Sequence, residues 1–107
     1  FFTAEHPLSF VSGAALVGDG CVLAAGAVVH PDARVGSHCY LGPGAVVDRD
    51  AEVGAGTWVS PGAVVGAGAR VGARVVLGQN ACVERKATVP SDAQVRALGF
   101  IGREDGG

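Results

Sequence analysis

An aliphatic residue recurs at every sixth position along almost the whole chain. From residue 11 to residue 95, fifteen positions spaced six apart are all Val or Leu, with no exception and no inserted loop. They are Val11, Val17, Leu23, Val29, Val35, Leu41, Val47, Val53, Val59, Val65, Val71, Leu77, Val83, Val89 and Val95. A fixed period decides the architecture before local propensities do, because each repeat must bury its apolar side against the next. The chain is therefore predicted to be a solenoid of hexapeptide repeats.

The residue two places before each aliphatic is small. From Val17 onward it is Ala in most hexads, with Cys21, Cys39, Thr57 and Val75 as the exceptions. Alternate side chains of a strand face the same way, so the small residue and the aliphatic both point inward and the residue between them points outward. Gly, Pro, Asn and Asp then turn the chain, and three hexads close one triangular coil of 18 residues. The expected fold is all-β, a single-stranded parallel β-helix of nearly five triangular coils without inserted loops.

The composition indicates one small domain. The chain has 107 residues, a formal net charge of −2 and 17% charged residues, which does not favour nucleic acid or an anionic membrane as a partner. No apolar run reaches the length of a membrane span, and no signal peptide is recognisable. The predicted organisation is a cap over 1–10, the β-helix over 11–95 and a partly disordered C-terminal tail over 96–107. A chain that begins with Phe1 rather than Met is expected to be a processed or excised fragment.

Cysteine and histidine usage indicates neither a disulfide framework nor a metal site. Cys21 and Cys39 are 18 residues apart and stack at the same inward position, where they are expected to be reduced, Ala-like core thiols. Cys82 takes an outward position without a partner, and no CxxC spacing occurs. A zinc site would need converging histidines, but three different columns hold His6, His30 and His38. We expect no metal and a cytoplasmic protein.

The outward positions form one charged face and two apolar faces. The charged face consists of Leu16, Arg34, Glu52, Arg70 and Thr88. The apolar faces consist of Val22, Tyr40, Trp58, Val76 and of Val28, Val46, Val64, Cys82. Apolar stripes of this size usually mark an interface, and the corner between these two faces is built from small residues, as at 24–26 and 60–62. We predict a parallel homotrimer with this corner toward the three-fold axis.

Several segments are specific enough to indicate a family. They are His6-Pro7, Ala24 to Val29, Pro31 to Gly36 and Ser60 to Val65. Over residues 6–95 the chain resembles the C-terminal β-helix of the hexapeptide-repeat acyltransferases, in the branch of sialic-acid O-acetyltransferases and amino-sugar N-acetyltransferases. The resemblance implies a left-handed helix and transfer of acetyl from acetyl-CoA to a hydroxyl or amine of a nucleotide sugar. It also implies a site in the cleft between subunits of a trimer, with CoA along that cleft. In that family a His within a Glu-His-Asp-like turn serves as the general base.

The chain departs from the family at this turn. The base position is Arg49, within Asp48-Arg49-Asp50, and arginine does not accept a proton at ordinary pH. We interpret Arg49 either as part of an exposed, ion-paired turn or as a contact for an anionic ligand. His30 lies 18 residues before Asp48 and therefore stacks one coil away from it. His30 is the candidate base, with Asp48 orienting its imidazole; the alternative is a surface histidine that caps the turn before Pro31.

The resemblance also indicates where CoA would bind. A second histidine of the family, which contacts the acetyl group or CoA, is replaced by Trp58 here. By the same resemblance, contacts with CoA are assigned to Trp58, Gly66 and Gly78. In this branch a small N-terminal domain usually precedes the β-helix. Because Phe1 stands almost at the helix entry, we expect that domain to be absent or to have been removed, so acceptor identity does not follow from the sequence.

Two hypotheses of different class stay open. The first is an acetyl-CoA-dependent acyltransferase acting on a sugar or related small acceptor, with His30 or a bound water in place of the lost base. The second is a non-catalytic trimeric β-helix, either a scaffold or a degenerate or engineered relative. The regular repeats and the lack of an inserted loop favour the second, whereas the segments shared with the acyltransferases favour the first.

Overall fold

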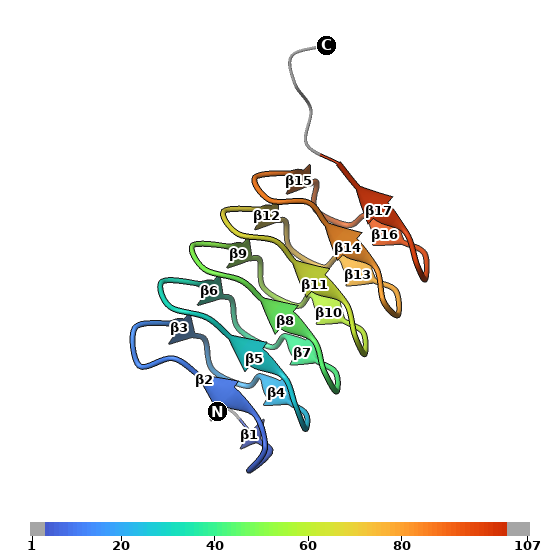
Figure 1. Ribbon diagram of the computed structural model, residues 1–107. Helices are drawn as coiled ribbons and strands as arrows, with labels where there is room; N and C mark the ends of the chain where they lie inside the picture. Colours follow the sequence, from blue (N-terminus) through green and yellow to red (C-terminus); the bar gives the residue numbers. More distant parts are fainter. Residues whose placement is uncertain (1–3, 103–107) are drawn as a thin grey trace.

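The computed structural model describes residues 4–102, which form a parallel β-helix of triangular cross-section (Figure 1). Its seventeen two-residue strands make three flat parallel sheets, which we call faces A, B and C. Face A contains β1 (Ala4–Glu5), β4 (Val22–Leu23), β7 (Tyr40–Leu41), β10 (Trp58–Val59), β13 (Val76–Leu77) and β16 (Gln94–Val95). Face B contains β2 (Phe10–Val11), β5 (Val28–Val29), β8 (Val46–Val47), β11 (Val64–Val65), β14 (Cys82–Val83) and β17 (Phe100–Ile101). Face C contains β3 (Leu16–Val17), β6 (Arg34–Val35), β9 (Glu52–Val53), β12 (Arg70–Val71) and β15 (Thr88–Val89).

Each strand pairs with the strands 18 residues before and after it, as the hexad period predicts. In face A, Trp58 pairs with Tyr40 on one side and with Val76 on the other. The inter-coil hydrogen bonds continue through the sheets, for example from the Trp58 N–H to the Val75 carbonyl at 2.8 Å. The predicted all-β helix of stacked triangular coils is confirmed.

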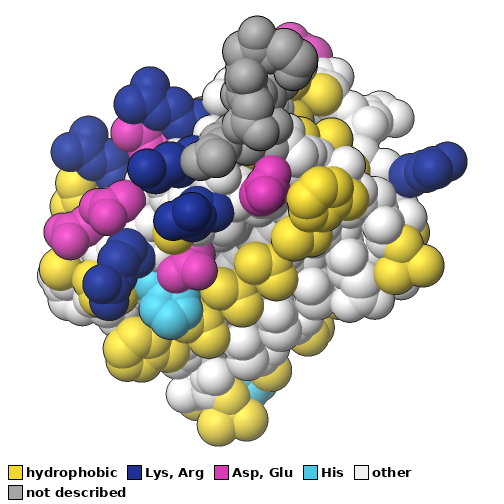
Figure 2. Space-filling model, turned by 45° about the horizontal axis from the view of Figure 1, so that its top comes forward, with side chains coloured by type: hydrophobic (Ala, Val, Ile, Leu, Met, Phe, Trp, Pro, Cys, Tyr) yellow, Lys and Arg dark blue, Asp and Glu magenta, His cyan; other side chains and the backbone are white. Residues whose placement is uncertain are grey.

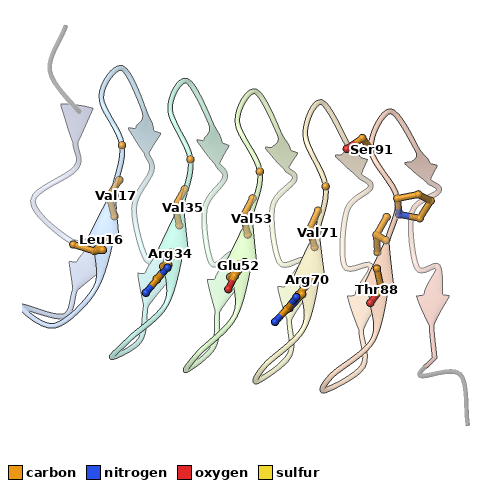
Figure 3. A pocket seen from close by; sticks show the side chains of 16 residues that line it. Leu16, Val17, Arg34, Val35, Glu52, Val53, Arg70, Val71, Thr88 and Ser91 are labelled. Atoms are coloured by element: carbon orange, nitrogen blue, oxygen red, sulfur yellow. The ribbon is translucent and has the colours of Figure 1, made fainter.

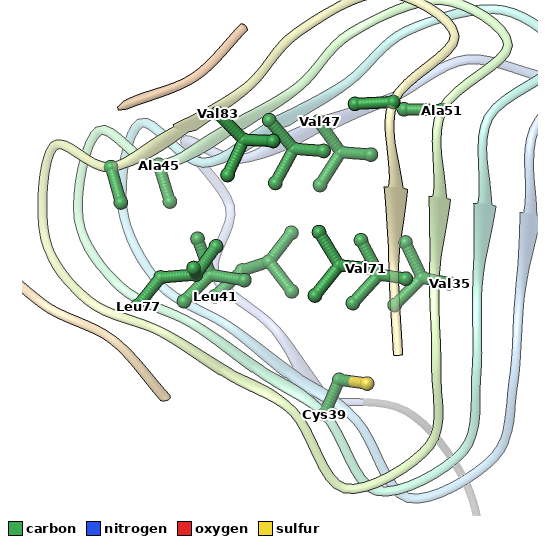
Figure 4. Packing of buried hydrophobic residues seen from close by; sticks show 14 of the residues in the cluster. Val35, Cys39, Leu41, Ala45, Val47, Ala51, Val71, Leu77 and Val83 are labelled. Carbon is green, nitrogen blue, oxygen red and sulfur yellow. The ribbon is translucent and has the colours of Figure 1, made fainter. Parts of the chain in front are cut away.

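The inward side chains fill the prism with aliphatic and small residues. Figure 4 shows Leu41 and Leu77 from face A, Val47 and Val83 from face B, and Val35 and Val71 from face C meeting in the middle, with Cys39 at one corner. These side chains are almost completely buried. Only a small residue fits at the corner ends of so narrow a core, which explains why Ala precedes most of the aliphatics by two positions.

The corners are three-residue turns, named here for the faces they join: corner AB (as at 60–62), corner BC (as at 48–50) and corner CA (as at 54–56). The third residue of these turns is left-handed, with φ of 62° at Asp50 and 74° at Gly62. Gly, Asn and Asp tolerate that conformation best, which is why they are enriched there. The first residue is often Gly because the next coil approaches it closely. A Cβ added to Gly54 would lie 2.6 Å from the Ala73 backbone nitrogen.

The sheets extend beyond the predicted limits of the β-helix. Strands β1 and β2 begin within the segment 1–10, and β17 lies within 96–107, where Ile101 packs against the core at the inward position of one more hexad. The structure therefore places helix residues on both sides of the predicted range 11–95. The expected disorder at 103–107 lies outside the described residues, as does the start of the predicted cap at 1–3. No helix in residues 4–102 is long and apolar enough to cross a membrane.

Cys21, Cys39 and Cys82 are free thiols, as expected. The first two are buried, and their Sγ atoms donate hydrogen bonds to the carbonyls of Gly36 at 3.1 Å and Gly54 at 3.2 Å. Burial raises the pKa of the Cys39 thiol to about 11. Thr57 takes the same slot in the next coil, and its hydroxyl donates to the Gly72 carbonyl at 2.9 Å. The polar side-chain atoms of Cys21, Cys39 and Thr57 in this inward column are thus all hydrogen-bonded to backbone carbonyls.

Candidate functional site

The three faces differ in surface chemistry. Face A presents Val22, Tyr40, Trp58, Val76 and Gln94, and face B presents Phe10, Val28, Val46, Val64, Cys82 and Phe100. Figure 2 shows a row of hydrophobic side chains along the prism, with charged side chains gathered at one side of it. Face C presents Arg34, Glu52 and Arg70 in successive coils. The predicted division into two apolar faces and one charged face holds at the predicted positions, and Gln94 adds an uncharged polar side chain to face A.

Corner BC brings His30 and Asp48 into neighbouring coils, as their spacing predicts. The His30 N–H donates to the Val47 carbonyl at 2.9 Å, immediately before Asp48. Both residues are partly exposed. The Asp48 carboxylate, however, accepts a hydrogen bond from the Arg49 backbone N–H at 2.7 Å, and within residues 4–102 it forms none with the His30 imidazole. The structure therefore places the two residues together but leaves the carboxylate engaged with its own turn.

Arg49 is exposed at the tip of the same corner. One of the two interpretations of Arg49 was an ion-paired turn, and the structure does not show such a pair. Between described residues the one ion pair joins Arg74 Nε to Asp92 Oδ1 at 2.8 Å. Asp50 has a left-handed backbone at this turn. The guanidinium is thus an exposed cation at the same corner as His30 and Asp48, and it is available for an anionic or aromatic partner.

Trp58 lies on face A, which is the side of the triangle opposite corner BC. Its indole is 51% exposed and stacks on the Tyr40 ring, with ring centroids 4.3 Å apart and an interplanar angle of 36°. Within one chain, Trp58 therefore does not share a site with His30, Asp48 and Arg49. A site containing all four side chains would require two subunits.

The remaining predicted CoA contacts, Gly66 and Gly78, lie on different corners, BC and AB. A Cβ at Gly66 would lie 2.6 Å from the Arg85 backbone nitrogen, and one at Gly78 would lie 2.6 Å from the Arg96 carbonyl carbon. The close approach of the next coil accounts for glycine at both positions. Contact with CoA at these two glycines stays a prediction.

Face C carries a feature that the sequence analysis did not predict, a shallow depression of about 660 Å³ that runs along the prism (Figure 3). Leu16, Arg34, Glu52, Arg70 and Thr88 border it in a row, one from each coil. The signal in the sequence was the glycine column at 18, 36, 54 and 72, which lacks the side chains that would fill it. The lining contains no histidine or cysteine and none of the predicted site residues.

Metal ligands do not converge in the described part of the chain. Within residues 4–102, no group of three or more His, Cys, Asp or Glu side chains is arranged to hold a metal ion. Over residues 30–32 and 48–50, corner BC carries one imidazole, three carboxylates and one guanidinium.

Comparison with known proteins relates this geometry to a family of transferases. The family described as "Bacterial transferase hexapeptide (six repeats)" matches residues 14–49 and 50–85. No curated protein sequence matches the chain. Among solved structures, the acetyltransferase domain of PglB from Neisseria gonorrhoeae is 31% identical, with a TM-score of 0.90 over 97% of this chain and 52% of that one. PerB from Caulobacter crescentus, in complex with CoA and GDP-perosamine, is 33% identical, with a TM-score of 0.93 over 96% of this chain and 50% of that one.

One of the similar structures is a histidine-to-alanine mutant. This variant of GDP-perosamine N-acetyl transferase from Caulobacter crescentus, in complex with CoA and GDP-perosamine, is 33% identical to this chain, with a TM-score of 0.93 over 96% of this chain and 49% of that one. That protein thus holds CoA and the nucleotide sugar with one histidine replaced. The present chain spans about half the length of these structures.

Proposed function

The chain belongs to the bacterial hexapeptide-repeat transferase family, and on that premise we propose that it is the left-handed β-helix of an acetyl-CoA-dependent acyltransferase. The acceptor is the amine or hydroxyl of a sugar, in particular of a nucleotide sugar. The observation that carries the proposal is the similarity of almost the whole chain to the acetyltransferase domain of PglB and to a GDP-perosamine N-acetyl transferase in complex with CoA. We further propose that the chain acts as a homotrimer through faces A and B and works in the cytoplasm.

Corner BC supplies the chemistry for this reaction. In acetyl transfer the acceptor attacks the thioester carbonyl, the bond from that carbon to sulfur breaks, and the acceptor loses a proton. His30 is the imidazole at this corner, and histidine is the side chain that most often serves as a general base. To Asp48, in the next coil, we assign the role of orienting that imidazole after its carboxylate leaves the Arg49 N–H.

Binding of acetyl-CoA distinguishes the proposed acyltransferase from a non-catalytic scaffold. Calorimetric titration of acetyl-CoA into the purified chain, with the oligomer mass measured on the same sample, is expected to give micromolar affinity at one site per subunit. The retention of CoA and GDP-perosamine by the histidine-to-alanine relative supports this expectation. An intact trimer that binds no acetyl-CoA would contradict the proposal.

Replacing the candidate base tests the mechanism. His30→Ala is expected to lower acetyl transfer by about 10²–10⁴-fold, the usual contribution of a positioned base, while the trimer stays intact. His38→Asn is the matched control, since His38 lies on corner CA and Asn tolerates its left-handed backbone. Transfer that is unchanged in His30→Ala would remove His30 from the mechanism.

The altered turn can be tested by restoring its imidazole. At protein concentrations where the variant is trimeric, Arg49→His is expected to raise the transfer rate, because it returns a proton acceptor to the position that the family uses. A cleft that binds acetyl-CoA yet gains nothing from this substitution would show that more than the base has been lost.

A second candidate function is a non-catalytic trimeric β-helix. The specific observation in its favour is that both histidine positions of the family are occupied by residues that cannot exchange a proton at neutral pH, Arg49 and Trp58. Trp58→Asp would place a charge on face A and is expected to dissociate the trimer, whichever function is correct. An unchanged mass by light scattering would contradict the proposed interface.

A further inference from the structure

The surface chemistry of the prism constrains how three copies close into a ring. Between residues 10 and 100, the outward strand positions of faces A and B carry no charge, whereas face C carries Arg34, Glu52 and Arg70. A three-fold ring joins two different surfaces of each copy, because the same contact repeats head to tail. Face A of one subunit then lies toward face B of the next, and corner AB points at the axis. This step rests on the trimer proposed above.

The same arrangement brings corner BC of one subunit toward face A of its neighbour. Corner BC is the outer edge of face B, and the corner of a triangle is acute, so the two faces diverge outward as a wedge. Only a long side chain from corner BC can cross this wedge. Rotation about the axis adds no rise, so residue number alone sets the height of each position along the trimer.

Height selects which residues oppose each other. One coil takes 18 residues, as in the pairing of Trp58 with Tyr40, and rises about 4.8 Å. Arg49 and Trp58 differ by 9 residues in the sequence, which is half a coil or about 2.4 Å of rise. They therefore lie at nearly the same level, on opposite sides of the cleft between two subunits.

Within the described chain, this register opposes a cation to an aromatic ring only once. The successive pairs, from the middle of corner BC to the outward position of face A, are Gly13 with Val22, Pro31 with Tyr40, Arg49 with Trp58, Ala67 with Val76 and Arg85 with Gln94. The Arg49 guanidinium has no ion-pair partner among the described residues, and Trp58 is 51% exposed. The stack on Tyr40, at 4.3 Å between ring centroids, holds the indole in place.

We infer that the Arg49 guanidinium of one subunit packs on the Trp58 ring of the next, so that three cation–π contacts fasten the clefts of the trimer. Arg49 is then an assembly residue that recognises a second copy of this chain. His30 lies about one coil, or 4.8 Å, closer to the N-terminal end of the prism. The contact between Arg49 and Trp58 therefore lies next to the level of His30, and the cleft at the level of His30 stays open to an acceptor.

The test compares two arginines at equivalent positions of corner BC. Arg49→Gln removes the cation opposite Trp58, and Arg85→Gln, two coils further on, removes a cation opposite Gln94. A cation–π contact at a partly exposed site changes an equilibrium by about fivefold, so three contacts should change the trimer dissociation constant by on the order of 100-fold. Sedimentation over a dilution series measures this constant. We expect the large change in Arg49→Gln and little change in Arg85→Gln.

Trp58 is the only tryptophan, so its fluorescence reports the contact directly. At concentrations where both variants are trimeric, acrylamide should quench Trp58 more in Arg49→Gln than in wild type, and equally in Arg85→Gln and wild type. Trp58→Leu should weaken the trimer as well, and adding Arg49→Gln to it should weaken the trimer no further.

The outcomes separate this inference from the function on which it rests. A trimeric wild type in which Arg49→Gln behaves like Arg85→Gln, in mass and in quenching, overturns the contact and leaves the trimer standing. Equal weakening by both variants also overturns it, since the effect would then be one of net charge. A wild type that is monomeric at all concentrations overturns the contact and the proposed trimer together, while acetyl-CoA titration still decides whether the chain binds its co-substrate.

Discussion

Replacement of a single corner glycine should destabilise the whole coil stack. A Cβ added to Gly54 would lie 2.6 Å from the Ala73 nitrogen, 2.6 Å from the Gly72 carbonyl carbon and 2.7 Å from the Gly72 oxygen. All three are backbone atoms of the next coil, so no side chain can rotate away. Relief to an ordinary contact of 3.4 Å requires the two coils to separate locally by 0.7–0.8 Å.

That separation also stretches the hydrogen bonds between coils. The Gly54 N–H donates to the Val71 carbonyl at 2.8 Å. A shift of this size would take the distance to about 3.6 Å, beyond the useful range of an N–H to oxygen bond. Overpacking costs about 1–3 kcal/mol and a weakened buried hydrogen bond about 0.5–1.5 kcal/mol. We therefore expect Gly54→Ala to lower the free energy of unfolding by about 2–4 kcal/mol.

Urea denaturation followed by circular dichroism measures this change, with Gly13→Ala as the matched control. A Cβ at Gly13 would meet no atom within 4 Å. Its substitution should therefore alter stability by no more than about 0.5 kcal/mol. Because stacked repeats can unfold in parts, Trp58 fluorescence should be recorded beside the dichroism and should give the same midpoint. Equal stability of the two alanine variants would refute the argument that coil stacking excludes a side chain at residue 54.

Three further results are expected from the same denaturation assay. Burial raises the pKa of Cys39 from 9.0 to about 11, so the folded chain holds this proton more tightly than the unfolded chain. The stability that this proton contributes is fully present below about pH 9. As the pH rises to about 11, the free energy of unfolding should fall by about 3 kcal/mol, and Cys39→Ala should not show this fall. Thr57→Val should cost about 1–2 kcal/mol, because it leaves the Gly72 carbonyl without its 2.9 Å donor, and Thr57→Ser should recover most of it. Arg74→Ala should leave the midpoint unchanged, since its ion pair with Asp92 is fully solvated; a clear loss would contradict this.

The candidate site could be predicted in part. The 18-residue spacing placed His30 and Asp48 in neighbouring coils of one corner and put Tyr40 and Trp58 in one column of face A, and the structure confirms both. It did not predict that the Asp48 carboxylate bonds to the Arg49 N–H, because side-chain rotamers in a turn depend on atoms a few ångströms away. It also missed the depression on face C, whose shape follows from the depth of the glycine column beside one row of outward side chains.

For this protein, the sequence alone determined which residues stack. In a solenoid each residue contacts its own coil and the coils beside it, so a strict period of six specifies the inward column, the faces and the corners. The tertiary structure decided what the period does not encode. It showed that the coils run on to Ile101, that the next coil excludes a Cβ at Gly54, and that Arg49 is exposed without an ion-pair partner among residues 4–102. These properties depend on distances between coils, and such distances are set by packing rather than by the order of residues.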